Sequence, residues 1–348
     1  MTAQAFNSPQ TLVCKGRRAK WWTRKGSPKR GFTYWTCDGK QVADEASLER
    51  IRSLVIPPAW KHVRISPHTT SKLQAVGLDS RGRIQYKYSP KFAEAQARKK
   101  FAKIESFGEY LPQMRRMTNE HIALDGFPRE KVLALMTRLI NSLYIRIGTD
   151  RSVREYRTYG ITTLGKRHIT FRRRGEVVFE FVGKSKIKHR KVVVDEELAG
   201  LLRELASIGR GRKLFQYLDD DGRPHPVTPT QINAYIKSIT APEYSAKDFR
   251  TWGATMLAAT ELAEIGTADD EKLLKKNVVR VVRSVAEQLG NTPTVCRSSY
   301  IHPLILTAYE KGITIQNFTP RRGRRLMRFE SELEPAELSL LEMFRNLH

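Results

Sequence analysis

The chain has 348 residues, enough for one large domain or two ordinary ones, and 40% of them are hydrophobic, which supports a folded core. Its 62 lysines and arginines outnumber 36 acidic residues, and the net charge of +26 is spread along the chain. This excess of positive charge predicts a polyanionic partner, most simply nucleic acid. A membrane is the weaker option, because we find no apolar run of about 18 residues.

The three cysteines, Cys14, Cys37 and Cys296, lie far apart and form no CxxC pair. This spacing indicates a reducing compartment and predicts neither a disulfide framework nor a zinc site. The N-terminus is polar where a signal peptide would need apolar residues. We therefore expect a cytoplasmic protein.

A small α+β unit is predicted for residues 31–90, behind a basic, loop-like start over residues 1–30. Strands are expected at Tyr34–Thr36 and Val63–Ser66, and a short helix at Asp44–Leu54. These short elements favour a β-rich N-terminal lobe.

The segment Asp79–Tyr88, DSRGRIQYKY, interleaves basic side chains with Gln85, Tyr86 and Tyr88. Cations, an amide and aromatic hydroxyls in one strand suit contacts with DNA phosphates and base edges. An exposed amphipathic strand without a ligand would show the same pattern, so both interpretations stay open at this point.

Ser89-Pro90 is the predicted boundary between an N-terminal domain, residues 1–90, and a second domain, residues 91–348. The second domain opens with a helical pattern over Phe92–Phe107. Its strongest helix is predicted over Arg129–Ile147, where apolar residues recur at helical spacing. Arg146 lies beside this apolar stripe, where a cation also complements the helix dipole.

An antiparallel meander is predicted next, with strands at Arg167–Arg172, Glu176–Val182 and Ile187–Val194. Lys184 falls in the second turn, on a long flexible side chain. Most lysines at such turns are inert, so Lys184 alone indicates no function.

From Asp195 onward the pattern predicts helices to the end of the chain. Arg250 lies inside an aromatic-rich helix, where a charge without a partner is costly. The predicted features are a helix cap at Thr228-Pro229, helices at Lys247–Leu262, Glu271–Leu289 and Pro335–Leu347, and a basic run at Arg321–Arg325.

The stretch Leu289–His302, LGNTPTVCRSSYIH, carries the candidate nucleophile. Gly290 ends one helix, and Thr292-Pro293 begins a short new one that leads to Tyr300. A tyrosine is a poor nucleophile because its phenol titrates near ~10, unless cations stabilise the phenolate. A lone tyrosine here would more often serve packing.

One phosphate-loop pattern is rejected. Gly160–Lys166, GITTLGK, fits GxxxxGK, but Arg167 stands where a magnesium-binding serine or threonine is needed. A β-meander follows instead of a helix. We therefore read the segment as strand and turn and do not expect ATP binding.

Taken together, these segments resemble the type IB DNA topoisomerases, in the small poxvirus-like form found in bacteria. The resemblance covers roughly Lys29 to Phe318, and its motifs are specific in this order. They are IPPAWKHV at 56–63, GRIQYKY at 82–88, YIRIG at 144–148, YGITTL at 159–164, FVGKSKIKH at 181–189, KDFRTWGAT at 247–255 and LGNTPTVCRSSY at 289–300.

The resemblance implies a role for several residues. It places the nucleophile on Tyr300, two phosphate-binding arginines on Arg146 and Arg250, and the general acid on Lys184. It places DNA contacts on Gln85, Tyr86, Tyr88 and Lys247.

Two positions depart from the family pattern. Asn291 stands where poxvirus enzymes carry a histidine, as it does in bacterial members, and it can donate a neutral hydrogen bond to the same phosphate oxygens. Ser152 stands where the family has a tyrosine, so we expect that phosphate contact to be lost or moved.

The implied reaction agrees with the chemistry of these side chains. Arginine forks suit the oxygens of a phosphate, and a lysine can protonate the leaving 5′ oxygen. The 3′-phosphotyrosyl product conserves the energy of the broken bond, so we expect no ATP, no metal and no other cofactor.

The expected fold is α+β, with a small β-rich N-terminal lobe and a larger, mainly helical catalytic domain that contains one meander. We expect a monomer that closes around supercoiled duplex DNA as a clamp, associated with the nucleoid and not with membranes. The main alternative is a tyrosine site-specific recombinase, although Lys247 replaces the histidine usual there. A non-enzymatic DNA-binding protein would explain the charge but not the set of candidate catalytic residues.

Overall fold

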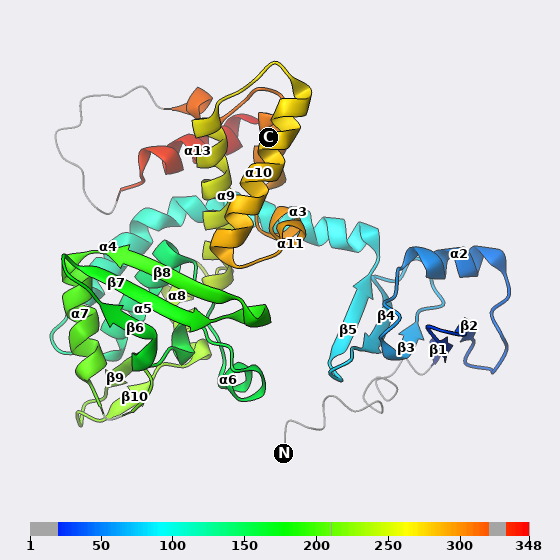
Figure 1. Cartoon of the computed structure of the whole chain (residues 1–348), viewed down its shortest axis with the longest axis horizontal. Helices are drawn as coiled ribbons and strands as arrows, with labels where there is room; N and C mark the ends of the chain where they lie inside the picture. The colour runs from blue at the N-terminus through cyan, green and yellow to red at the C-terminus, as the bar shows by residue number, and fades with distance from the viewer. Residues whose placement is uncertain (1–19, 210, 320–331, 348) are drawn as a thin grey trace. The chain divides into compact units, whose positions relative to one another are not determined.

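The computed structural model describes residues 20–209, 211–319 and 332–347 (Figure 1). It divides into two compact units, Met1–Lys100 and Phe101–His348, and the division falls inside helix α3 (Pro90–Phe107). Strands dominate the first unit and helices the second, so the predicted α+β class is confirmed. Cys14 and the basic run Arg321–Arg325 lie outside the described residues.

The first unit is built on a five-stranded antiparallel sheet, in the order β2-β1-β3-β4-β5, with helix α2 packed on it. Ile51 of the helix packs with Val63, Ile65 and Ala75 in the core of this unit. The elements are β1 (Trp22–Ser27), β2 (Gly31–Trp35), α2 (Glu45–Ser53), β3 (Lys61–Ile65), β4 (Leu73–Leu78) and β5 (Ile84–Tyr88).

Strand β1 corrects the prediction of a loop over residues 1–30. It pairs with both β2 and β3, so it lies inside the sheet. The Arg24 guanidinium fixes it, donating to the Trp60 carbonyl at 2.5 Å and lying 4.1 Å from the Phe32 ring. Such contacts cannot be read from the basic composition of the segment, which by itself predicted a loop.

The second unit contains a three-stranded antiparallel sheet, β6-β7-β8, which confirms the predicted meander. Strand β7 (Glu176–Val182) has the predicted bounds, and β8 covers Lys188–Val194. Strand β6 (Ile169–Phe171) is shorter than predicted, because Lys166–His168 form a 3₁₀ turn in which the Gly165 N–H donates to His168 Nδ1 at 2.8 Å.

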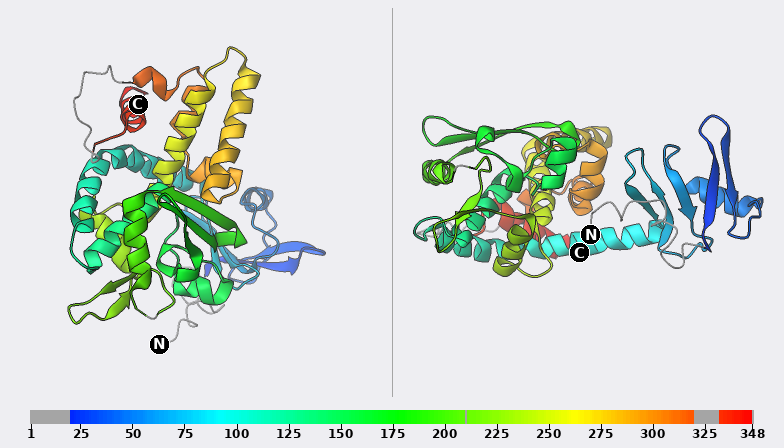
Figure 2. Two further views of the ribbon diagram at one scale, coloured as in Figure 1. Left: turned by 60° about the vertical axis from the view of Figure 1, so that its left-hand side comes forward. Right: turned by 90° about the horizontal axis from the view of Figure 1, so that it is seen from below.

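Helices form the rest of this unit around one large core. Helix α5 is buried along most of its length, and α9 and α10 run side by side (Figures 1 and 2). The helices are α4 (Leu111–Ile122), α5 (Arg129–Leu143), α6 (Asp150–Tyr156), α7 (Glu196–Ser207), α8 (Pro229–Ile239), α9 (Ala246–Ile265), α10 (Glu271–Leu289), α11 (Pro293–Ser299), α12 (Pro303–Tyr309) and α13 (Pro335–Leu347).

Helix α5 ends at Leu143 and not at Ile147 as predicted. Tyr144 adopts a left-handed conformation, φ 53°, and its N–H closes the helix on Ile140 O at 3.0 Å. Arg146 therefore lies in a loop after the helix, so it is not a residue that complements the helix dipole.

Two further predictions are corrected. The region after Asp195 is not wholly helical, because β9 (Gln216–Leu218) and β10 (Pro224–Pro226) form a hairpin. The GITTLGK segment forms 3₁₀ turns and no strand, and the Lys166 ammonium donates to the carbonyls of Ile208 and Gly209 at 2.9 and 2.8 Å. Lys166 is thus already bound within the protein.

In the parts of the chain that the structure describes, none of the helices combines the length and the apolar character needed to cross a bilayer.

Candidate active site

Tyr300 directly follows the short helix α11 and is half-buried. The helix begins where the sequence predicted, with the Thr292 side chain accepting from the Val295 N–H and Pro293 at its start. The Tyr300 N–H donates to Cys296 O at 2.9 Å, and its carbonyl accepts from Thr255 Oγ1 at 3.3 Å. The backbone of the candidate nucleophile is therefore fixed to α9.

Arg250 projects from α9 and is only 4% exposed. Its Nη1 donates to the Tyr144 carbonyl, and its Nη2 donates to the Leu289 carbonyl at 2.9 Å. The guanidinium carbon lies 5.3 Å from the centre of the Tyr300 ring. Arg250 is thus held against the tyrosine by two carbonyls from distant parts of the chain.

Arg146 reaches the same place from the loop after α5. Its Nη2 donates to Gly290 O at 3.3 Å and to the Asn291 side-chain oxygen. The loop is itself held, because the Arg146 carbonyl accepts from the Ile161 N–H at 2.8 Å. The structure thereby brings Arg146, Asn291 and Tyr300 together, although they are far apart in the sequence.

Two buried donors in this site have no protein partner within the described residues: Arg250 Nε and Asn291 Nδ2. A buried polar group left unpaired costs about 1–3 kcal/mol, so a water, an ion or a ligand is needed to satisfy such groups. An oxygen-rich anion would satisfy both. The oxygens of a phosphodiester are acceptors of this kind.

The two arginines change the acidity of the tyrosine. Burial by itself raises the pKa of Tyr300, but the charges of Arg250 and Arg146 and a hydrogen bond from Arg250 outweigh it, so the pKa lies below the usual value. Burial, and then repulsion from Arg146, lower the pKa of Arg250 to about 10. The arrangement favours the phenolate, which is the nucleophilic form.

Lys184 lies at the tip of the β7–β8 hairpin, in a 3₁₀ turn over Lys184–Lys186. It is exposed and lines a small cavity together with Arg146, Arg250 and His189. Lys247 is exposed one turn before Arg250 on α9, and its charge also favours the Tyr300 phenolate.

The three predicted DNA contacts of the first unit lie on β5, at the edge of its sheet. Tyr86 and Tyr88 are 45% and 48% exposed, and their rings stack with centres 6.2 Å apart. Gln85 points to the opposite face, as alternation along a strand requires, and donates to Asp79 Oδ2 at 3.1 Å. The structure does not bring Gln85 onto the tyrosine face.

Ser152, at the departure from the family pattern, lies in the first turn of α6. Its hydroxyl forms a hydrogen bond with the Thr149 hydroxyl at 2.8 Å, and its N–H donates to Thr149 Oγ1 at 3.1 Å. This residue therefore takes part in capping a helix.

Sequence reasoning missed Thr255, His189 and Lys191. His189 fits between two glycines: a Cβ at Gly290 would lie 2.2 Å from His189 Cε1, and one at Gly183 would lie 2.6 Å from its Cδ2. Burial, Lys191 and the two arginines lower the pKa of His189 to about 4, so it is neutral at physiological pH. Because side chains alternate along a strand, the sequence of β8 could have predicted that His189 and Lys191 lie on the same face.

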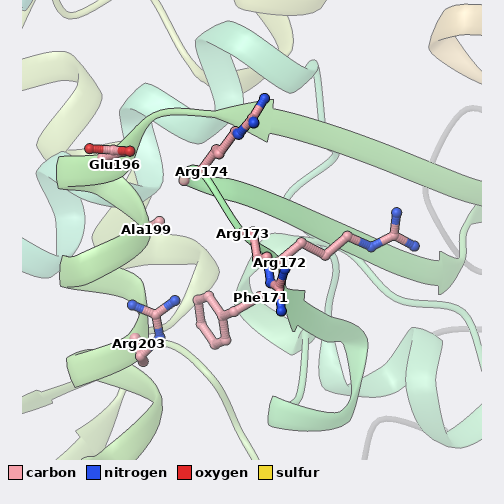
Figure 3. A pocket seen from close by; sticks show the side chains of 8 residues that line it. Phe171, Arg172, Arg173, Arg174, Glu196, Ala199 and Arg203 are labelled. Carbon is pink, nitrogen blue, oxygen red and sulfur yellow. The ribbon is translucent and has the colours of Figure 1, made fainter.

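A larger pocket of about 600 Å³ lies at the β6–β7 turn, at the other end of β7 from Lys184 (Figure 3). It supplies mainly positive charge and contains none of the candidate catalytic residues. Its charged lining residues are Arg172, Arg173, Arg174, Arg203 and Glu196. Among all the described residues, this pocket included, no group of three or more His, Cys, Asp or Glu side chains could hold a metal ion.

Comparison with known proteins gives consistent matches. The family model described as the eukaryotic DNA topoisomerase I catalytic core matches residues 89–320, and that of the bacterial DNA topoisomerase IB N-terminal domain matches residues 31–79. DNA topoisomerase 1B of Acanthamoeba polyphaga mimivirus is 29% identical over 288 residues, 81% of this chain and 85% of the viral protein. DNA topoisomerase I of Monkeypox virus is 24% identical over 291 residues, 77% of this chain and 87% of that protein.

Among solved structures, the XerH site-specific recombinase bound to difH substrate covers 53% of this chain and 47% of that chain. The two are 14% identical with a TM-score of 0.34, too low to support an argument about function.

Proposed function

Because this chain belongs to the type IB DNA topoisomerases, we propose that Tyr300 is the residue that cleaves and rejoins one strand of the DNA. The Tyr300 phenol loses its proton to solvent, and the phenolate oxygen attacks the phosphorus of a phosphodiester. An O–P bond forms between Tyr300 and the phosphate on the 3′ side, and the bond to the 5′ oxygen breaks. Lys184 supplies the proton to that leaving oxygen. Attack by the 5′ hydroxyl reverses each step and releases the tyrosine.

The arginine pair supplies the charge that this reaction needs. Negative charge grows on the nonbridging oxygens during attack, and Arg146 and Arg250 carry fixed donors suited to them. Asn291 adds a neutral donor. The observation that carries this proposal is the convergence of both arginines on Tyr300, with Arg250 Nε and Asn291 Nδ2 left unpartnered beside it.

The bond energy is stored in the phosphotyrosyl link, so the proposed cycle needs no nucleotide. Relaxation then follows from rotation of the broken strand about the intact one.

We further propose that the protein acts on supercoiled duplex DNA of the nucleoid as a monomer. Tyr86, Tyr88 and Lys247 are proposed as additional DNA contacts because they are exposed polar or cationic groups. Gln85 stays a proposed contact that must first leave Asp79.

A plasmid relaxation assay with EDTA and without ATP tests the proposal. Wild-type protein is expected to convert supercoiled plasmid into a ladder of relaxed topoisomers. Strict dependence on added magnesium or ATP would overturn the proposed use of arginines and lysine. Binding without a covalent adduct would instead indicate a non-enzymatic DNA-binding protein, and products recombined between two sites would indicate a recombinase.

A further inference from the structure

The C-terminal end of α10 is a point where three cations meet. The last carbonyls of a helix have no partner within the helix and form the negative end of its dipole. Here the Ala286 and Glu287 carbonyls accept from the N–H groups of the following turn. The next three carbonyls accept from side chains: Gln288 O from Lys191 at 2.5 Å, Leu289 O from Arg250 at 2.9 Å, and Gly290 O from Arg146 at 3.3 Å.

Lys191 comes to this point from the inner face of β8. Side chains along β8 alternate, so Lys188 and Arg190 are exposed whereas His189 and Lys191 are half-buried. Lys191 also lines the cavity that contains Arg146, Arg250 and Lys184. Within the described residues no carboxylate pairs with Lys191, and its contact is the Gln288 carbonyl.

Placing a third cation here is electrostatically costly. Burial, followed by repulsion from Arg250 and Arg146, lowers the pKa of Lys191 to about 8. The titratable and charged groups facing it are His189 on its own strand, Lys184 on the hairpin, Arg146 on the loop after α5 and Arg250 on α9. The Lys191 ammonium is thus held beside two arginines by a backbone carbonyl.

We propose that Lys191 is a further positioning residue for DNA cleavage: its ammonium holds the last turn of α10 and thereby places Asn291, Arg146 and Arg250 at the scissile phosphate. The inference rests on the proposed function of the site. Asn291 follows that turn directly, and its N–H donates to Ala286 O at 2.8 Å, so a shift of the turn moves the amide. The β8 strand is also continuous with the hairpin that carries Lys184, so the same contact ties the general acid to the phosphate-binding groups.

The test compares Lys191→Met, which keeps the aliphatic stem, with Lys191→Arg, which keeps the charge. Lys188→Met is the matched control, because it removes the same charge from the exposed face of the same strand. Single-turnover cleavage of a short duplex and its binding affinity are measured for each, together with thermal unfolding. We expect Lys191→Met to cleave about 10–100-fold more slowly, the size of a small misplacement of reacting groups. Affinity should change little, and Lys191→Arg should recover most of the rate.

The pH profile separates positioning from a merely structural role. Cleavage at subsaturating enzyme reports groups of the free enzyme. The charged fraction of Lys191 falls as pH rises through about 8, whereas arginine stays charged. The ratio of wild-type to Lys191→Arg rates should therefore fall by about five- to tenfold between pH 7 and pH 9, since a group titrating at about 8 loses most of its proton over that range and its neutral form keeps the residual rate of Lys191→Met.

A wild-type rate in Lys191→Met would overturn the inference. So would a slow Lys191→Arg variant together with a flat ratio of rates, because the lysine would then serve only stability. Failure of the proposed function looks different: the wild-type protein itself would form no adduct at any pH.

Discussion

Within the described residues, the two arginines beside Tyr300 are held by neutral oxygen acceptors and form no ion pair with a carboxylate. Arg250 donates to Tyr144 O and Leu289 O, and Arg146 donates to Gly290 O and Asn291. A carboxylate partner would compete with DNA and leave a buried negative charge near the phosphate. Carbonyl oxygens orient the guanidinium groups yet leave their net charge available to a phosphate.

Replacing Tyr300 by phenylalanine removes one hydroxyl and leaves the basic surface unchanged. We expect Tyr300→Phe to abolish covalent adduct and plasmid relaxation, with DNA affinity within about threefold of wild type, since phosphate contacts dominate affinity. Tyr217→Phe, on β9, is a matched control that should keep activity. Adduct formation by the Tyr300→Phe variant would show that another residue is the nucleophile.

The proposed general-acid role of Lys184 can be tested by changing the leaving group of the DNA substrate. A 5′ oxygen leaves poorly without a proton, whereas a 5′ sulfur leaves readily because thiols titrate near ~8.5. Lys184→Ala should cleave ordinary DNA about 10²–10⁴-fold more slowly, the size of a general-acid effect, and should recover most of its rate on a 5′-phosphorothiolate substrate.

Arg250→Ala serves as the comparison in the same single-turnover assay. It should show little recovery, because its proposed contacts are the nonbridging oxygens, which the sulfur leaves unchanged. If Lys184→Ala is equally slow on both substrates, the lysine positions the phosphate and Arg146 becomes the first candidate for the proton donor.

The residues of the site were predictable to the extent that each lies in a recognisable motif. Tyr300, Arg146, Arg250, Lys184 and Asn291 were all named from the sequence, and their roles stay proposals. Motifs did not reveal the supporting contacts. Thr255 and Lys191 bind backbone atoms of other elements, and His189 packs beside Gly290, which is distant in the sequence. A linear pattern does not record such contacts.

At the scale of elements, the site depends on two close backbone approaches behind Arg146. Gly148 has φ +83°, and a Cβ at Gly160 would lie 2.3 Å from the Arg146 carbonyl and 2.5 Å from the Gly148 nitrogen. The 3₁₀ turn after Gly160 therefore contacts the loop that carries Arg146, and its Ile161 N–H donates to the Arg146 carbonyl. A Cβ added at Gly160 would therefore push against the backbone of the loop that carries Arg146.

Gly160→Ala should therefore damage both stability and catalysis. We expect a loss of about 1–3 kcal/mol in the free energy of unfolding, as for overpacking in a core. Cleavage should slow by about 10²-fold, because Arg146 is displaced. Thermal or denaturant unfolding and single-turnover cleavage measure the two effects.

Gly200→Ala is the matched control for that substitution. Gly200 lies within α7, and a Cβ there meets nothing within 4 Å. The change should stabilise the protein by about 0.5–1 kcal/mol, since alanine loses less backbone entropy in a helix, and leave cleavage unchanged. An unaltered cleavage rate in Gly160→Ala would contradict the proposed coupling between the two backbones.

Elements with a strong period were predicted well, and tertiary contacts account for the errors. Helices α10 and α13 have the predicted bounds. Helix α5 was predicted too long because Tyr144 ends it, with its ring against Gly253 and its carbonyl bound by Arg250. Strand β4 was missed because it is buried on both faces and shows no alternation.

At the scale of the whole molecule, the net charge of +26 determines how DNA binding responds to salt. Each phosphate neutralised by a cation contributes a slope near −0.9 in log K against log salt concentration. We expect binding of a short duplex to weaken steeply between low and physiological salt. A titration by fluorescence anisotropy at several salt concentrations measures the slope, and a flat profile would contradict a protein that contacts DNA through its phosphates.

The proposal that Tyr300 is the nucleophile can be read directly from the covalent complex. Wild-type protein is mixed with supercoiled plasmid, stopped with detergent during turnover, and digested with nuclease and protease. Mass spectrometry then identifies the peptide that carries the nucleotide, and end analysis identifies the DNA end attached to it. We expect a single peptide, modified at Tyr300 and linked to the 3′ side of the break. A nucleotide on another residue, or a link to the 5′ side, would contradict it.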